Sequence, residues 1–166
     1  MFTNKIFIKI FRFVVLYEQN YKYSLYTSRY QLPKSFKFNG NGIKFYGDGL
    51  LRIGKKTYIG SYSRIQLTTN TEVIIGDFCR ISHNVRIYTS SAIADQDFRK
   101  AQSLQYKIGN VNIGDGVWIG ANVLINPGIT ISSNSVIGAN SVVTKDIPPN
   151  SIYGGVPAKL IRTKNV

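Results

Sequence analysis

His83 is the only histidine in the sequence and the side chain best suited to proton transfer near neutral pH. It lies in the stretch ISHNVRIYTSSAIADQDF, residues 81–98, which is rich in hydroxyl, amide and carboxylate groups. An imidazole changes its charge in the neutral range and often serves as a general base. A single histidine can also be an ordinary polar surface residue, so the elements around His83 must decide between these interpretations.

The composition limits the other kinds of chemistry. One cysteine, Cys79, accompanies the histidine, and these two side chains cannot form a Cys/His zinc site, so we expect no metal requirement. A lone thiol fits a reducing compartment, and we expect a cytoplasmic location. The formal net charge of +13 favours an anionic partner such as a nucleic acid, a membrane surface or a polyphosphate cofactor. The basic residues are scattered without the aromatic pattern of an RNA module, so we expect no nucleic acid.

A period of six residues runs through most of the chain and positions His83. Six residues supply one short strand and one corner, and three such units form a triangular coil with its aliphatic residues pointing inward. Stacked coils then pair their strands in parallel. Branched aliphatic residues mark the period in three runs: Ile53, Ile59 and Ile65; Ile75, Ile81 and Ile87; and Ile113, Ile119, Ile125, Ile131, Ile137 and Val143.

The longest interruption of the repeat lies between Ile87 and Ile113, where about twenty residues are added to the period. Long loops on a rigid repeat scaffold are usually functional. We therefore divide the chain into a helical segment at residues 1–35, a β-helix at 36–152 with a loop at about 89–110, and a tail at 153–166.

Counting along the repeat places His83 in a column of small residues. It stands two positions after Ile81, and the equivalent positions of other coils hold Ser61, Ala121 and Ala139. Parallel strands lie about 4.8 Å apart. The imidazole thus has methyl-sized neighbours along the column, which predicts a shallow trough with a base at one end.

The hexad, an aliphatic residue, Gly, two variable residues and a small or β-branched residue, resembles the hexapeptide-repeat acyltransferases. The resemblance implies an all-β fold, a left-handed parallel β-helix of about four to five coils, here with an N-terminal amphipathic helix and an extruded loop. The handedness follows from the resemblance alone, because parallel crossovers are otherwise right-handed.

The stretch ISHNV resembles the catalytic hexad of the sugar N-acetyltransferases and lipid A acyltransferases of this family, which implies His83 as general base with Asn84 beside it. Asn84 stands where an acidic residue is common and offers only a neutral dipole. The end of the chain most resembles the galactoside and maltose acetyltransferase branch, whose catalytic histidine lies in the loop after the third hexad, at the position of Ala92. Either His83 is the base, or the β-helix is a catalytically inactive scaffold.

The resemblance also implies a binding site for acetyl-CoA, because VVTKDIPPNS and GVPAKLIR look like the cofactor segments of the family. A backbone N–H next to Ala121 would hold the oxyanion. The pantetheine arm is expected along Trp118, Ala121 and Ala139. The phosphates are expected to face Thr144, Lys145, Lys159 and Arg162.

For the acceptor, the loop offers groups that can hydrogen bond to sugar hydroxyls in Asp95, Asp97 and Arg99. We expect acetyl-CoA-dependent O-acetylation of a saccharide in surface-polysaccharide biosynthesis. The alternative is N-acetylation of a nucleotide-linked amino sugar. Members of the family are usually homotrimers with the cofactor between neighbouring subunits, so the resemblance implies a homotrimer.

Residues 1–17, MFTNKIFIKIFRFVVLY, form an amphipathic segment. The segment is too short and too often charged to span a membrane, and it lacks the cleavage site of a signal peptide. On a helix, Lys5, Lys9 and Arg12 share one face, and apolar residues occupy the rest. Two interpretations remain open: a peripheral contact at the inner face of the membrane, or packing on the chain's own domain or a neighbouring subunit.

Overall fold

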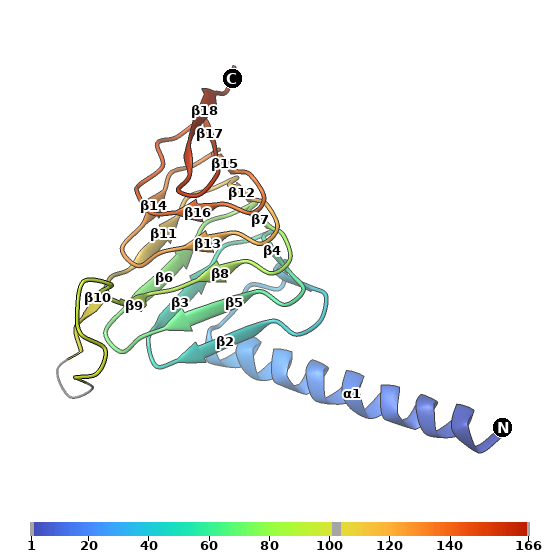
Figure 1. Ribbon diagram of the computed structural model, residues 1–166. Helices are drawn as coiled ribbons and strands as arrows, with labels where there is room; N and C mark the ends of the chain where they lie inside the picture. Colours follow the sequence, from blue (N-terminus) through green and yellow to red (C-terminus); the bar gives the residue numbers. More distant parts are fainter. Residues whose placement is uncertain (1, 101–103, 166) are drawn as a thin grey trace.

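The computed structural model describes residues 2–100 and 104–165 and contains a left-handed parallel β-helix of about five turns with one helix, α1 (Phe2–Arg29), at its base (Figure 1). The expected fold is thereby confirmed. Met1, residues 101–103 of the predicted loop and Val166 of the predicted tail lie outside the described residues. Along the helical residues that the structure describes, no stretch is apolar enough over a sufficient length to span a bilayer.

Three faces of short parallel strands form the prism. Face 1 contains β1 (Lys37–Asn39), β4 (Tyr58–Gly60), β7 (Arg80–Ile81), β12 (Trp118–Ile119), β15 (Val136–Ile137), β17 (Ser151–Gly154) and the antiparallel β18 (Lys159–Thr163). Face 2 contains β2 (Lys44–Gly47), β5 (Arg64–Leu67), β8 (Arg86–Ile87), β13 (Leu124–Ile125) and β16 (Val142–Val143). Face 3 contains β3 (Leu50–Ile53), β6 (Glu72–Ile75), β11 (Val111–Ile113) and β14 (Thr130–Ile131).

The core of the prism is a stack of aliphatic side chains. Ile59 is in register with Ile81, and Ile119 with Ile137, so each residue covers its equivalent in the turn below. These four side chains are at most 1% exposed. Because burial of apolar surface contributes about 25 cal/mol per Å², the stacked columns are the main source of stability of the prism.

The corners require a left-handed backbone at the third position after a core aliphatic residue. We call the corner between faces 1 and 2 the first corner and that between faces 2 and 3 the second corner. At the first corner Asn84, Asn122 and Asn140 have φ angles of 54°, 60° and 58°. At the second corner Gly128 has a φ of 80°. Asparagine and glycine adopt positive φ angles at little cost, which explains why they recur at the corners of the repeat.

The C-terminal half of α1 closes the bottom of the core. The ring of Tyr23 stacks on that of Phe38 with 4.2 Å between centroids. The Tyr23 hydroxyl donates to the Gly40 carbonyl at 2.9 Å and accepts from the Ile43 N–H at 3.1 Å. Burial raises the pKa of Tyr23. The helix is thus fastened to the first turn of the prism at the first corner.

Two segments depart from the regular coil. The predicted loop leaves the prism at the second corner and contains an antiparallel hairpin, β9 (Ser90–Ala92) and β10 (Tyr106–Ile108), in which Ala92 pairs with Tyr106. At the other end, β17 pairs in parallel with β15, and β18 folds back antiparallel on β17. The predicted tail therefore contains an additional strand of face 1.

Candidate active site

His83 lies at the first corner, in the turn between β7 and β8, and its side chain is exposed. The register of β4, β7, β12 and β15 places Ser61, His83, Ala121 and Ala139 on successive turns, as the counting predicts. Backbone bonds hold the column together, since the Asn122 N–H donates to the His83 carbonyl at 3.1 Å. Ala121 and Ala139 therefore occupy the two turns on the C-terminal side of His83, and Ser61 occupies the turn on the side of α1.

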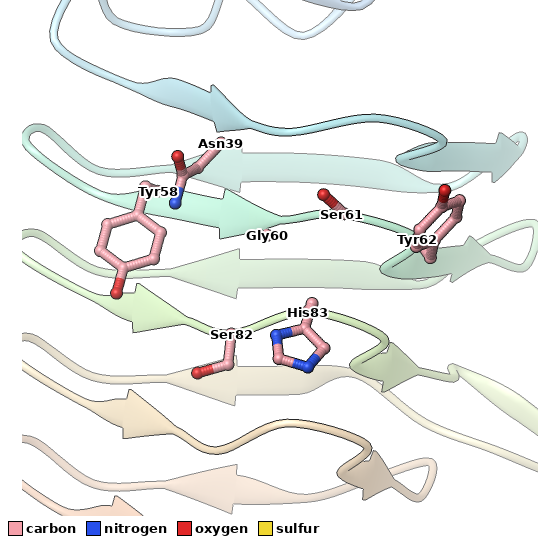
Figure 2. Close-up of a pocket in the computed structure, with 7 residues that line it drawn as sticks. All are labelled: Asn39, Tyr58, Gly60, Ser61, Tyr62, Ser82 and His83. Carbon is pink, nitrogen blue, oxygen red and sulfur yellow. The ribbon is translucent and has the colours of Figure 1, made fainter.

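An open hollow of about 420 Å³ lies beside the imidazole, towards the base of the prism (Figure 2). In Figure 2, Tyr58 and Tyr62 stand on either side of it, and Ser61 occupies the neighbouring turn. A Cβ at Gly60 would lie 2.7 Å from the His83 backbone nitrogen, so glycine permits the close approach of these two turns. The hollow is lined by Asn39, Tyr58, Gly60, Ser61, Tyr62, Ser82 and His83.

The hydrogen bonds around His83 leave its ring available. The Nδ2 of Asn84 donates to Oδ1 of Asn122 at 2.9 Å, and Nδ2 of Asn122 donates to Oδ1 of Asn140 at 2.9 Å. This asparagine ladder occupies the amide nitrogen of Asn84, the residue that the sequence places beside the base. Among the residues that the structure describes, no group forms a hydrogen bond with the imidazole.

One backbone N–H beside the column is available to donate a hydrogen bond to an oxyanion. The N–H groups of Gly120 and Asn122, which flank Ala121, already donate to the carbonyls of Ile137 at 2.8 Å and His83 at 3.1 Å. This corrects the expectation of a donor next to Ala121, because the strand ladder uses both neighbours. Within the described chain, the N–H of Ala121 itself has no acceptor.

The residues predicted for the cofactor fall into two groups. Trp118, which is 52% exposed, stands on face 1 near the column, and β18 brings Lys159 and Arg162 to the C-terminal end of the same face. Thr144 and Lys145 instead follow β16 at the second corner. A single chain therefore does not bring together all four residues expected to face the phosphates.

The loop residues predicted for the acceptor are also remote from His83. The hairpin carries Asp95, Asp97 and Arg99 at the second corner, on the other side of face 2 (Figure 1). Nε of Arg99 donates to Oδ1 of Asp97 at 2.9 Å, and Nη2 donates to Oδ2 at 3.1 Å. These hydrogen bonds lower the pKa of Asp97. The pair organises its own loop, and one chain alone does not join it to the imidazole.

A cation ladder on face 2, formed by Lys44, Arg64 and Arg86, was not singled out from the sequence. These residues are in register on successive turns, and all three are exposed. Among the described residues, no ion pair neutralises them. Like charges on directly opposed residues repel, so the cation ladder is suited to an anionic ligand. The sequence signal is a basic residue immediately before the core aliphatic or aromatic residue in each of these three strands.

The chain is similar to acetyltransferases along much of the prism. The profile of the family described as bacterial transferase hexapeptide (six repeats) matches residues 110–145. The galactoside O-acetyltransferase of Escherichia coli (strain K12) is 43% identical over 116 residues, which cover 68% of this chain and 56% of that protein. The chain spans about half the length of the curated relatives it matches.

Two solved structures extend the similarity. A polySia-specific acetyltransferase is 29% identical with a TM-score of 0.60, over 79% of this chain and 65% of that one. A hexapeptide-repeat acetyltransferase of Vibrio cholerae O1 biovar eltor, complexed with acetyl-coenzyme A, is 30% identical with a TM-score of 0.51, over 74% of this chain and 72% of that one. With these similarities and its six-residue register, the chain belongs to the bacterial hexapeptide-repeat transferase family.

Proposed function

We propose that this protein transfers the acetyl group of acetyl-CoA to a hydroxyl of a saccharide, with His83 as the general base. One observation carries the proposal: the only imidazole of the chain stands where the column of Ala121 and Ala139 meets a polar and aromatic hollow. The trough suits a narrow, extended pantetheine arm, and the hollow suits a sugar ring. His83, the proposed general base, lies between the two.

His83 takes the proton of the acceptor hydroxyl as its oxygen attacks the thioester carbonyl carbon. A C–O bond forms, the C–S bond breaks, and the imidazolium returns the proton to the departing sulfur, so that atoms and charge balance. The N–H of Ala121 donates to the carbonyl oxygen while that oxygen is negatively charged. Asn84 supports His83 through the left-handed backbone of the corner. Its side chain belongs to the asparagine ladder that fixes this corner.

The residues of face 1 support the placement of the cofactor. Trp118 flanks the trough, and Lys159 and Arg162 offer positive charge to the phosphates. Thr144 and Lys145, together with the hairpin, lie at the other corner. In a homotrimer with head-to-tail interfaces, neighbouring copies use two different surfaces, and this allows the second corner of one copy to meet the first corner of the next. We therefore propose a homotrimer in which each site is completed by a neighbouring chain.

The hollow supports a saccharide acceptor. Tyr58 and Tyr62 offer aromatic faces to a sugar ring, and Asn39 and Ser61 offer hydrogen-bonding groups to its hydroxyls. The cation ladder on the adjoining face 2 suits an acceptor with negative charge. We propose that the acceptor is a saccharide of surface-polysaccharide assembly, and the similarity to a polySia-specific acetyltransferase is consistent with this class.

The test measures acetyl transfer to a panel of neutral and acidic oligosaccharides and, separately, CoA binding by calorimetry. We expect His83→Ala to bind CoA with unchanged affinity and to lose about 10² to 10⁴ in rate, the usual contribution of a general base. A variant His83→Gln keeps a polar side chain of similar length and should be equally slow. Full acetyl transfer by His83→Ala would show that another group is the base.

A second function is favoured by Ala92, because the resemblance to the galactoside branch implies that this residue stands at the position of the loop histidine of that branch. In that case the prism is an inactive scaffold or binding module. Calorimetry and thermal unfolding with CoA distinguish the two functions, because CoA bound to the folded enzyme raises its thermal stability. If the folded protein at high concentration showed neither binding heat nor a gain in thermal stability with CoA, the scaffold would be favoured.

A further inference from the structure

The first half of α1 exposes apolar side chains that the rest of the described chain does not cover. Figure 1 shows this half projecting beyond the base of the prism. The exposed fractions range from 43% for Val15 to 69% for Phe13. A contiguous apolar surface of this kind marks an interaction site. The residues are Ile6, Phe7, Ile8, Ile10, Phe11, Phe13, Val14, Val15, Leu16 and Tyr17.

The prism contacts α1 through one face of the helix. Nε2 of Gln19 donates to Oδ1 of Asn41 at 3.1 Å, and the Tyr23 hydroxyl, one helical turn later, donates to the Gly40 carbonyl at 2.9 Å. Residues three and four positions apart share a helix face. This spacing continues the same face towards the N-terminus through Leu16, Arg12, Lys9 and Lys5.

A second set of residues lies on the opposite side of α1. We call it the apolar ridge, and it contains Phe7, Ile10, Val14 and Tyr17, which recur at spacings of three and four. The ridge therefore faces away from the prism, while the basic residues lie on the prism side. Whatever covers the ridge approaches from below the base and not from the chain's own core.

The charge distribution identifies the occupant of the ridge. From residue 4 to residue 17 the helix carries Lys5, Lys9 and Arg12, and the first acidic residue is Glu18. Three positive charges without an acidic residue among them are attracted to an anionic bilayer, which also offers acyl chains to the apolar ridge. We propose that residues 4–17 lie in the interface of an anionic phospholipid membrane, with the apolar ridge among the acyl chains and the basic side chains among the head groups.

This orientation has a consequence for the active site, which rests on the proposed function. The prism stands with its first turn nearest the membrane, and His83 lies two strand spacings, about 10 Å, above β1. Asn39 of the hollow directly precedes Gly40, which holds the helix. A saccharide linked to a membrane lipid can therefore present its first sugars at the level of the imidazole.

The experiment is co-sedimentation of the full chain with vesicles of phosphatidylcholine alone or with phosphatidylglycerol. We expect binding to the anionic vesicles, weakened by salt. The variant Phe7→Ser/Ile10→Ser should lose at least about tenfold in partitioning, because each substitution removes a large apolar side chain that the bilayer would bury. The matched control is Leu50→Ser/Ile74→Ser, which changes two exposed apolar residues of face 3 and should bind as the parent does.

Two readouts separate this proposal from the proposed function. Acetyl transfer to a soluble oligosaccharide should be the same in the ridge variant and the parent, while transfer to a lipid-linked acceptor in vesicles should fall with partitioning. Equal vesicle binding by the ridge variant and the parent would overturn the membrane assignment. A loss of oligomer mass in the ridge variant without lipid would overturn it in favour of a second copy.

Discussion

The first and second corners of the prism are built from the same repeat and are used differently. The first corner continues without interruption through its turns, and its asparagine ladder and alanine column lead to His83. The second corner has glycine at position 128, and in the third turn it gives rise to the hairpin with Ala92. The comparison indicates that regular corners align residues along the axis of the prism, whereas an interrupted corner extends a loop away from it.

The largest expected effect comes from moving the histidine between the corners. We expect His83→Ala to lose about 10² to 10⁴ in kcat/KM, and His83→Ala/Ala92→His to remain as slow. The new imidazole would lie on the hairpin, so it would not occupy the position beside the hollow from which His83 acts, either in its own chain or beside a neighbour. The measurement is acetyl transfer under identical conditions. Recovery of activity in the double variant would identify the hairpin corner as the site of chemistry.

The next effect tests the trough. Ala121→Leu should weaken CoA binding by about tenfold or more, which corresponds to about 1.4 kcal/mol, because the larger side chain fills the space beside His83. Ala121→Ser adds only one oxygen and should retain the affinity. Calorimetry with CoA measures both. If the leucine variant bound CoA as tightly as the parent, the cofactor would not follow the first corner.

A smaller effect concerns stability, measured in one turn at its two corners. Asn122→Ala should cost about 2 kcal/mol, because alanine is strained at positive φ and two ladder hydrogen bonds are lost. Gly128→Ala should cost about 1 kcal/mol, since only backbone strain opposes it and the nearest atom to a new Cβ is 3.8 Å away. Chemical denaturation measures both. Equal losses would show that the ladder contributes nothing.

The smallest effect lies within the hairpin. Because hydrogen bonds from Arg99 stabilise the ionised carboxylate, the pKa of Asp97 is lowered from its ordinary value of 3.8. The contribution of the pair is present above that value and declines as the pH falls through the lower folded-state pKa. We expect carboxyl NMR to find a midpoint below 3.8, which Arg99→Ala should raise towards that value. An unchanged midpoint would show that the pair does not persist in solution.

Much of the fold and part of the site could be predicted because the repeat is strict. Aliphatic residues every six positions define the core, and counting from Ile81 is sufficient to place His83 in one column with Ala121. The hollow could not be predicted, because Asn39 comes from an irregular first turn. The separation of Asp95 and Asp97 from His83 was also missed, since proximity in sequence does not reveal that face 2 lies between them.

The sequence by itself determined the period, the inward residues and the single possible imidazole base, because a hydrophobic core selects aliphatic side chains at fixed intervals. Only the tertiary structure decided which backbone donors remain free, as at Ala121, and which side of α1 meets the prism. These properties depend on contacts between segments that lie far apart along the chain. No local pattern of residues specifies them.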